Sequence, residues 1–201
     1  MIKYISLDLQ GTLTDSKFSD NFWLEILPNK YSQCFNITID EAKNMLKNKF
    51  KEYGVYNILY YDDKYWSKYL KFDTKHELNL SQIKPQINKE LYNYISTLNL
   101  PKIIISTTTN LFINEELKDK IKIFDKIYSC VDYFNVGGKT ENVYKAVCKE
   151  LNIKPSEMLH IGDNKVMDIE NAKKAGVNTI LFQNDTENVI KEIKNILNEG
   201  T

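Results

Sequence analysis

The chain of 201 residues is long enough for one substantial core domain and a small insertion. Its hydrophobic content of 42% is ordinary for a globular protein, and 27 basic residues balance 27 acidic ones, so no net charge would attract nucleic acid as a partner. No apolar run reaches the ~20 residues that span a bilayer, so no membrane partner is expected. The N-terminus lacks a signal-peptide core and the cysteines fit reduced thiols, which together predict a cytoplasmic location.

Four short apolar runs are predicted to be strands, and helical segments alternate with them. The runs cover residues 2–8, 102–106, 158–162 and 178–182. Helices are predicted over residues 87–98, 110–119, 140–151, 166–175 and 186–197. Strands that alternate with helices form a parallel sheet with helices on both faces. The sequence therefore predicts a doubly wound, Rossmann-like α/β core formed by residues 1–13 and 85–201.

Residues 14–84 break this alternation and are predicted to be helical throughout. The capping-box motif at residues 38–41 opens a helix that Gly54 can end. An aromatic helix is predicted over residues 56–72, and Pro28 is expected to end or kink the first helix of the segment. The segment is therefore predicted to be a small helical domain inserted after the first strand. Its aromatic residues are expected chiefly to form its own core, with a smaller contribution to a substrate pocket.

Polar side chains stand at or just after the ends of three predicted strands. Asp8 ends the first strand, Ser106 ends the second, and Asp163 follows the third. Ligands of doubly wound sheets bind beyond the carboxyl ends of the strands, so these side chains are expected to share one site. A carboxylate can attack a phosphoryl group when a divalent cation offsets the repulsion between the anions, and two carboxylates suit Mg²⁺. His160 lies inside a predicted strand and is expected to be a satisfied core residue.

Four motifs in this order resemble the signatures of the haloacid dehalogenase-like superfamily. They are Asp-Leu-Gln-Gly-Thr from Asp8, Ser106 after an apolar run, Lys139 in Gly-Gly-Lys-Thr, and Gly162-Asp163 followed by Asp168. The resemblance covers residues 2–182. Any one of these motifs alone would be weak, but the ordered set is specific.

The resemblance implies a hydrolase whose inserted helical domain, residues 14–84, is a cap over the site. Asp8 would be the nucleophile, and Ser106 and Lys139 would hold the phosphoryl oxygens. The implied Mg²⁺ ligands are Asp8, the backbone carbonyl of Gln10, Asp163 and, through the metal shell or its waters, Asp168. The implied residues of the loop and the substrate pocket are Gly11, Thr12, Thr107, Thr108 and Asn110.

Gln10 departs from the family's phosphatase pattern, which has a second aspartate at this position. That aspartate serves as the general acid and base, a role typically worth roughly 10²–10⁴ in rate, and an amide has no proton to transfer at ordinary pH. Three functions therefore stay open. They are a phosphatase that is slow or acts on esters with good leaving groups, a haloacid dehalogenase-type hydrolase, and a noncatalytic phospholigand-binding protein.

The motif residues that match the family pattern favour one of these three functions over the other two. Dehalogenases of the superfamily work without metal and lack the Gly-Asp pair, so Gly162 and Asp163 favour phosphate chemistry. Asp8 and Lys139 argue against a binding protein, which has little need of a nucleophile. The sequence therefore predicts a Mg²⁺-dependent phosphohydrolase that acts on a small phosphorylated metabolite through an aspartyl-phosphate.

Overall fold

The computed structural model describes residues 1–81 and 83–198 and contains a parallel sheet of five strands in the order β3-β2-β1-β4-β5. The strands are β1 (Tyr4–Leu7), β2 (Lys102–Ser106), β3 (Lys126–Ser129), β4 (Met158–Gly162) and β5 (Asn178–Leu181). The predicted doubly wound α/β core is therefore confirmed. Gln82 and residues 199–201, which fall in the ranges predicted for the insertion and the core, lie outside the described residues.

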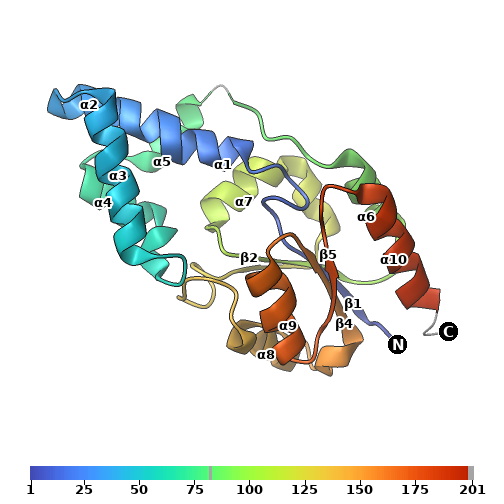
Figure 1. Cartoon of the computed structure of the whole chain (residues 1–201). Coiled ribbons are helices and arrows are strands. Elements are labelled where there is room, and N and C mark those ends of the chain that lie inside the picture. The colour runs from blue at the N-terminus through green and yellow to red at the C-terminus, as the bar shows by residue number, and fades with distance from the viewer. Residues whose placement is uncertain (82, 199–201) are drawn as a thin grey trace.

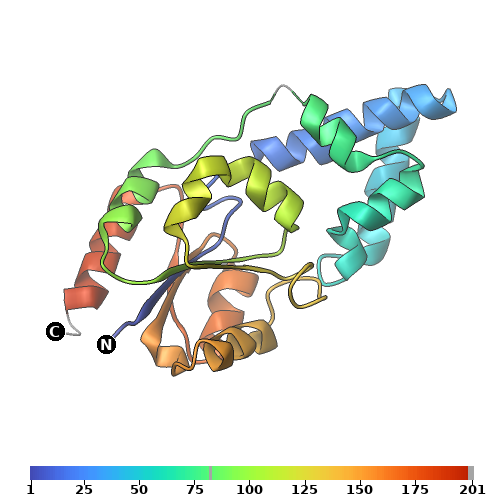
Figure 2. The same cartoon turned by 180° about the vertical axis from the view of Figure 1, so that it is seen from behind.

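Helices cover both faces of the sheet, as Figure 1 and the reverse view in Figure 2 show. One face carries α6 (Lys89–Thr97), α7 (Asn110–Leu117) and α10 (Thr186–Asn198), and the other carries α8 (Glu141–Glu150) and α9 (Asn171–Lys174). Side chains of β2 alternate between the two cores, because Ile104 packs with α6 and α7 while Ile103 and Ile105 pack with α8. Among the described residues, no helix is long and apolar enough to cross a bilayer.

Shorter helical turns complete the core. The 3₁₀ turns are Lys118–Ile123 after α7 and Pro155–Glu157 before β4. A π-helical turn, Lys165–Glu170, leads directly into α9. The helix predicted over residues 166–175 is therefore present, with a wider first part than an α-helix has.

Helices between β1 and α6 form a separate group with its own aromatic core, seen at the upper left of Figure 1. The group contains α1 (Lys17–Asn21), a π-helical turn (Phe22–Ile26), α2 (Leu27–Phe35), α3 (Ile39–Tyr53), a 3₁₀ turn (Ile58–Tyr60), α4 (Asp63–Leu70) and α5 (Thr74–Leu80). Trp66 and Phe22 are fully buried at its centre. Phe112 of α7 packs into the same cluster and joins the group to the sheet domain.

The prediction of a helix over residues 56–72 was wrong for the first part of that range. Asp62 accepts hydrogen bonds from the backbone N–H groups of Lys64 and Tyr65, so α4 begins only at Asp63. The capping box of Thr38 and Glu41 is confirmed at the start of α3.

Of the two effects expected of Pro28, an end or a kink of the first helix of the insertion, the structure rules out the end. It is the second residue of α2, directly after the π-helical turn Phe22–Ile26, and the chain stays helical to Phe35. The missing N–H of Pro28 falls where the hydrogen-bond pattern changes from π to α, so no regular α-helical bond is lost. The strand β3 was also missed, because its sequence has only two apolar residues, Ile127 and Tyr128, between polar neighbours.

Candidate active site

Asp8 lies directly after the central strand β1, between the two neighbours β2 and β4. Ser106 ends β2 and Asp163 follows β4, so the topology places the predicted side chains at one edge of the sheet. The chain turns sharply at Gly11, which has φ +86°. A Cβ atom added at Gly11 would lie 2.4 Å from Oδ2 of Asp163, so the close approach of this turn to Asp163 requires glycine.

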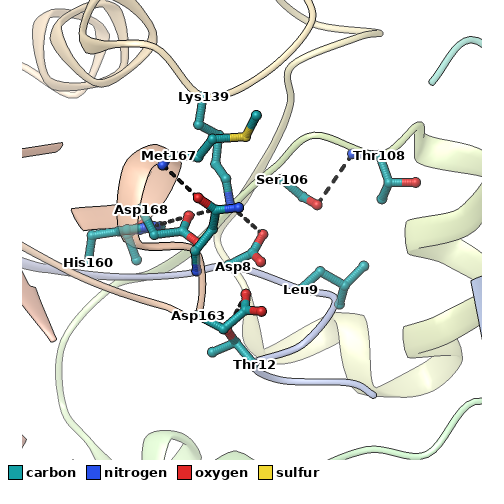
Figure 3. A network of polar contacts seen from close by, with 12 residues as sticks. Asp8, Leu9, Thr12, Ser106, Thr108, Lys139, His160, Asp163, Met167 and Asp168 are labelled. Atoms are coloured by element: carbon teal, nitrogen blue, oxygen red, sulfur yellow. Dashed lines mark hydrogen bonds and ion pairs between the residues drawn. The ribbon is translucent and has the colours of Figure 1, made fainter. Parts of the chain in front are cut away.

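Lys139 lies between two buried carboxylates, as Figure 3 shows. Its Nζ atom is 2.6 Å from Oδ1 of Asp8 and forms a second ion pair with Oδ1 of Asp168. Burial alone would lower the pKa of Lys139, but the two carboxylates outweigh it and hold the pKa above its ordinary value. The side-chain amide of Asn171 donates to the carbonyl oxygen of Lys139 at 2.8 Å, which fixes the backbone of this loop.

Asp168 is held by a second set of contacts that the sequence analysis missed. The ring nitrogen Nε2 of His160 lies 3.1 Å from Oδ1 of Asp168, and the backbone N–H of Asn164 donates to Oδ2 at 2.9 Å. Although burial favours the neutral acid, contacts with Lys139 and His160 hold the pKa of Asp168 below its ordinary value. Burial lowers the pKa of His160. In a neutral ring that donates from Nε2 to Asp168, Nδ1 is the acceptor, and it lies 2.8 Å from Oγ of Ser6.

Three carboxylates are placed so that they could hold a divalent cation. Asp8, Asp163 and Asp168 each offer an oxygen atom, and these atoms lie within 4.8 Å of one another. Burial raises the pKa of Asp8 to about 8, with Asp168 adding to the effect against the opposing charge of Lys139. A further positive charge at this position would therefore be stabilised. The all-oxygen donor set fits Mg²⁺.

The predicted pocket residues after β2 divide into two groups. Oγ of Ser106 accepts from the backbone N–H of Thr108 at 3.4 Å, and Thr108 lines a cavity of about 200 Å³ together with Gln10. Thr107 is half-buried and interacts with the hydroxyl of Tyr61 from the insertion. Asn110 is exposed and lines a different cavity, away from Gln10. Its backbone N–H donates to the carboxylate of Asp132. Asn110 is the first residue of α7 and does not lie with the other predicted site residues.

The inserted helices cover the Lys139 loop and close one side of this cavity. A Cβ atom at Gly137 would lie 2.4 Å from the carbonyl carbon of Asn57, and one at Gly138 would lie 2.8 Å from the Tyr56 ring. The insertion therefore packs directly on the two glycines before Lys139. The part of the insertion that lines the cavity comprises Ser19, Asp20, Trp23, Leu24, Phe50, Tyr60 and Tyr61.

The side chain of Gln10 is bound to a buried carboxylate that the sequence analysis also missed. Nε2 of Gln10 donates to Oε1 of Glu116 at 2.5 Å, and Oγ1 of Thr14 donates to Oε2 at 2.5 Å. Burial raises the pKa of Glu116 to about 7, with the charge of Asp15 adding to the effect and the two hydrogen bonds opposing it.

Glu116 carries only a weak signal in the sequence. It lies on the same face of α7 as Phe112 and Ile113, one turn earlier, and both are buried. An acidic residue at a buried helical position needs a polar partner. That reasoning marks Glu116 as unusual, but nothing in the sequence identifies Gln10 as its partner.

Comparison with known proteins agrees with the motifs. The family model for haloacid dehalogenase-like hydrolases matches residues 5–182. A glyceraldehyde 3-phosphate phosphatase of Pyrococcus furiosus is 25% identical over 195 residues, which cover 90% of this chain and 81% of that protein. A HAD phosphatase from Thermococcus onnurineus has a similar fold, with a TM-score of 0.78 and 17% identity over 92% of this chain and 87% of that one.

A further solved structure shares the fold. YfnB from Bacillus subtilis, described as bound to magnesium, has a TM-score of 0.60 and 17% identity, and the match covers 92% of this chain and 88% of that chain. The match of the family model over residues 5–182 extends well beyond half of the chain. The chain therefore belongs to the haloacid dehalogenase-like hydrolases, as the order of its four motifs predicted.

Proposed function

We propose that the protein is a Mg²⁺-dependent phosphohydrolase that acts on a small phosphorylated metabolite through an aspartyl-phosphate at Asp8. The observation that carries this proposal is the ion pair of Lys139 with Asp8, at 2.6 Å, within a cluster of three carboxylates. A buried ammonium beside the nucleophile can balance the negative charge of an incoming phosphoryl group. The likeness to a phosphatase of Pyrococcus furiosus supports the same chemistry.

In the first step a carboxylate oxygen of Asp8 attacks phosphorus, and the bond from phosphorus to the leaving oxygen breaks. The leaving oxygen departs with the electron pair of that bond and takes a proton from water. Lys139 and the hydroxyl of Ser106 would stabilise the phosphoryl oxygens, Lys139 as a compact positive charge. Mg²⁺, when bound, supplies the charge that offsets repulsion between the two anions. The groups that would hold Mg²⁺ are Asp8, Asp163, Asp168 and the backbone carbonyl of Gln10.

The inserted helices are proposed to act as a cap that selects the leaving group. The cavity of about 200 Å³ joins Gln10 and Thr108 of the sheet domain to aromatic residues of the insertion, among them Trp23 and Tyr60. A leaving group in this cavity would contact rings on one side and the catalytic edge on the other. The cap would consist of residues 14–84, with the remaining chain as the catalytic core.

The two alternative functions are less well supported. A metal-free dehalogenase would have no use for three carboxylates within 4.8 Å of one another. A phospholigand-binding protein would have no use for a buried nucleophile such as Asp8 paired with Lys139. Gln10 is expected to slow the enzyme most on esters whose leaving group needs a proton.

A panel of phosphorylated metabolites with and without Mg²⁺ tests the proposal directly. We expect hydrolysis of at least one phosphoester that EDTA abolishes, and no halide release from a 2-haloacid. The variant Asp163→Ala should bind Mg²⁺ about tenfold or more weakly in calorimetry, because a carboxylate ligand is lost. Halide release without metal, or phosphoester binding without any turnover, would contradict the proposal.

A further inference from the structure

The buried carboxylate of Glu116 has no part in the function proposed above, yet it binds the residue at which this chain departs from the family pattern. Glu116 is 2% exposed, and its two oxygens accept hydrogen bonds from Gln10 and Thr14 at 2.5 Å each. The Thr14 hydroxyl also lies 3.2 Å from the carbonyl oxygen of Leu9, in the loop that follows β1. Within residues 1–81 and 83–198, no cationic side chain forms an ion pair with Glu116.

This pairing determines which way the Gln10 amide faces. Nε2 of Gln10 donates to Oε1 of Glu116, and this is the orientation that an ionised Glu116 requires, because a carboxylate accepts hydrogen bonds and cannot donate them. The carbonyl oxygen Oε1 is then the amide atom left for other partners. Gln10 also lines the cavity of about 200 Å³ beside Thr108. With Nε2 bound to Glu116, Oε1 is the atom of this amide that can accept a hydrogen bond from the contents of that cavity.

We propose that Glu116 is a positioning residue that holds the Gln10 amide so that Oε1 accepts a hydrogen bond from the hydrolytic water. This inference rests on the proposed phosphatase function. In the second step the water oxygen bonds to phosphorus, the bond from phosphorus to Asp8 breaks, and Asp8 leaves as a carboxylate. One water proton stays on the new oxygen and the other passes to a phosphoryl oxygen, which gives dihydrogen phosphate. An amide can orient a water in this way without accepting its proton.

The same pairing explains why an amide rather than a carboxylate stands at position 10. A carboxylate there would face the buried carboxylate of Glu116 with no proton donor between them, and like charges at close range destabilise each other. Gln10 and Glu116 therefore form a matched pair. Exchanging the two chemical groups should preserve the hydrogen bond, whereas changing either one alone should disrupt it.

Glu116→Gln is the first variant, because it keeps the volume of the side chain. If Thr14 continues to donate to the new amide oxygen, the new NH₂ group faces Gln10, which must turn its own oxygen toward residue 116. Rapid-quench experiments with a labelled phosphodonor measure formation and decay of the phosphoenzyme separately. We expect decay to slow about tenfold or more, with formation changed less than about twofold. The matched control, Glu115→Gln on the neighbouring residue, should leave both rates unchanged.

The exchanged pair Gln10→Glu/Glu116→Gln is the second variant. The new amide at position 116 would donate to the new carboxylate at position 10 and still accept from Thr14, so the fold and the acceptor in the cavity are both restored. Gln10→Glu alone should slow phosphoenzyme decay, and the double variant should recover it to within about threefold of the wild-type rate or exceed it. If Glu116 served only to pack α7, a change at position 10 would not restore the rate of phosphoenzyme decay lost in Glu116→Gln.

A measurement that needs no turnover separates this inference from the proposed function. The side-chain amide protons of Gln10 should shift and exchange faster in NMR spectra of Glu116→Gln, and stay unchanged in Glu115→Gln. An unchanged Gln10 signal, or formation and decay slowed equally, would overturn the positioning role. If the wild-type protein forms no phosphoenzyme and hydrolyses no phosphoester while the Gln10 signal shifts as expected, the phosphatase function fails and this role fails with it.

Discussion

Two hydrogen-bonded groups flank the end of β1, and they compensate buried charge in different ways. In the lysine network, formed by Lys139, Asp8, Asp168 and His160, two carboxylates share one ammonium group. In the glutamine pair, formed by Gln10 and Glu116 and completed by the Thr14 hydroxyl, the donors that hold the carboxylate are neutral in the described part of the chain.

The pKa values of Asp168 and Glu116 differ accordingly. The pKa of Asp168 lies below its ordinary value although burial opposes this, because Lys139 and His160 stabilise the charge. The pKa of Glu116 is raised to about 7, because two neutral hydrogen bonds do not offset burial. Lys139 and His160 thus keep Asp168 ionised, whereas burial and the charge of Asp168 raise the pKa of Asp8, in the same network, to about 8 against the opposing charge of Lys139. Neutral partners suit a group whose task is to orient another side chain.

Asp8→Asn should have the largest effect. A carboxamide is a far poorer nucleophile than a carboxylate, so turnover should fall on the order of 10³-fold or more, well beyond any change in the glutamine pair. Steady-state rates on the best substrate of the metabolite panel provide the measurement. Undiminished turnover in Asp8→Asn protein free of wild-type contamination would remove Asp8 from the mechanism.

Lys139→Met should have the next largest effect and tests whether the lysine network supports the fold as well. Without the ammonium group, Asp8 and Asp168 remain buried and lose their ion pairs, and the free energy of unfolding should fall by about 3–5 kcal/mol. Urea denaturation measures this change. As a control, Lys145→Met removes an exposed lysine that pairs with Glu141, and it should change stability by less than about 1 kcal/mol. Similar losses of unfolding free energy in Lys139→Met and Lys145→Met would contradict a role of the lysine network in the stability of the fold.

Gly137→Ala should have a smaller effect, because it disturbs the contact between the Lys139 loop and the insertion. The added Cβ would lie 2.4 Å from the carbonyl carbon of Asn57, so one backbone must shift. We expect a loss of about 1–3 kcal/mol in the free energy of unfolding and a higher KM, since Tyr60 and Tyr61 line the cavity nearby. Val136→Ala, at the exposed neighbouring position, is the control and should leave KM unchanged. An unchanged KM in Gly137→Ala would show that this contact does not shape the cavity.

Thiol modification should have the smallest effect on the enzyme. Burial raises the pKa of Cys130 to about 12 and that of Cys148 to about 11, so both thiols stay protonated at pH 8 and react poorly. Iodoacetamide at pH 8 should therefore label the exposed Cys34 and leave activity unchanged. Mass spectrometry that found Cys130 labelled before Cys34 would contradict the burial of Cys130.

The sequence predicted one of these two groups and missed the other for a physical reason. Asp8, Lys139 and Asp168 stand in motifs, and the first of them ends an apolar strand, so parallel topology alone predicts where it lies. The pairing of Gln10 with Glu116 depends on how α7 packs beside the loop after β1, which no local pattern encodes. The contact from His160 to Asp168 was missed for the same reason, since a strand pattern predicts burial but not the partner.

Local features decided the remaining differences in the fold. The strands β1, β2 and β4 were predicted because their apolar runs are continuous or nearly so, and β5 because Phe182 extends the pair Ile180 and Leu181. In contrast, β3 has only Ile127 and Tyr128 between polar residues. The start of α4 was missed because the side-chain cap of Asp62 competes with the helical pattern of the aromatic residues before it.

The central claim is that Asp8 carries the phosphoryl group, and trapping that group tests it most directly. The protein would be mixed with a labelled phosphodonor and Mg²⁺, quenched in acid, digested and analysed by mass spectrometry. We predict an acyl phosphate on the peptide that contains Asp8, destroyed by hydroxylamine, absent from Asp8→Asn, and longer-lived in Glu116→Gln. Turnover of the same donor with no label at Asp8, in the wild-type protein and in Glu116→Gln alike, would contradict the account.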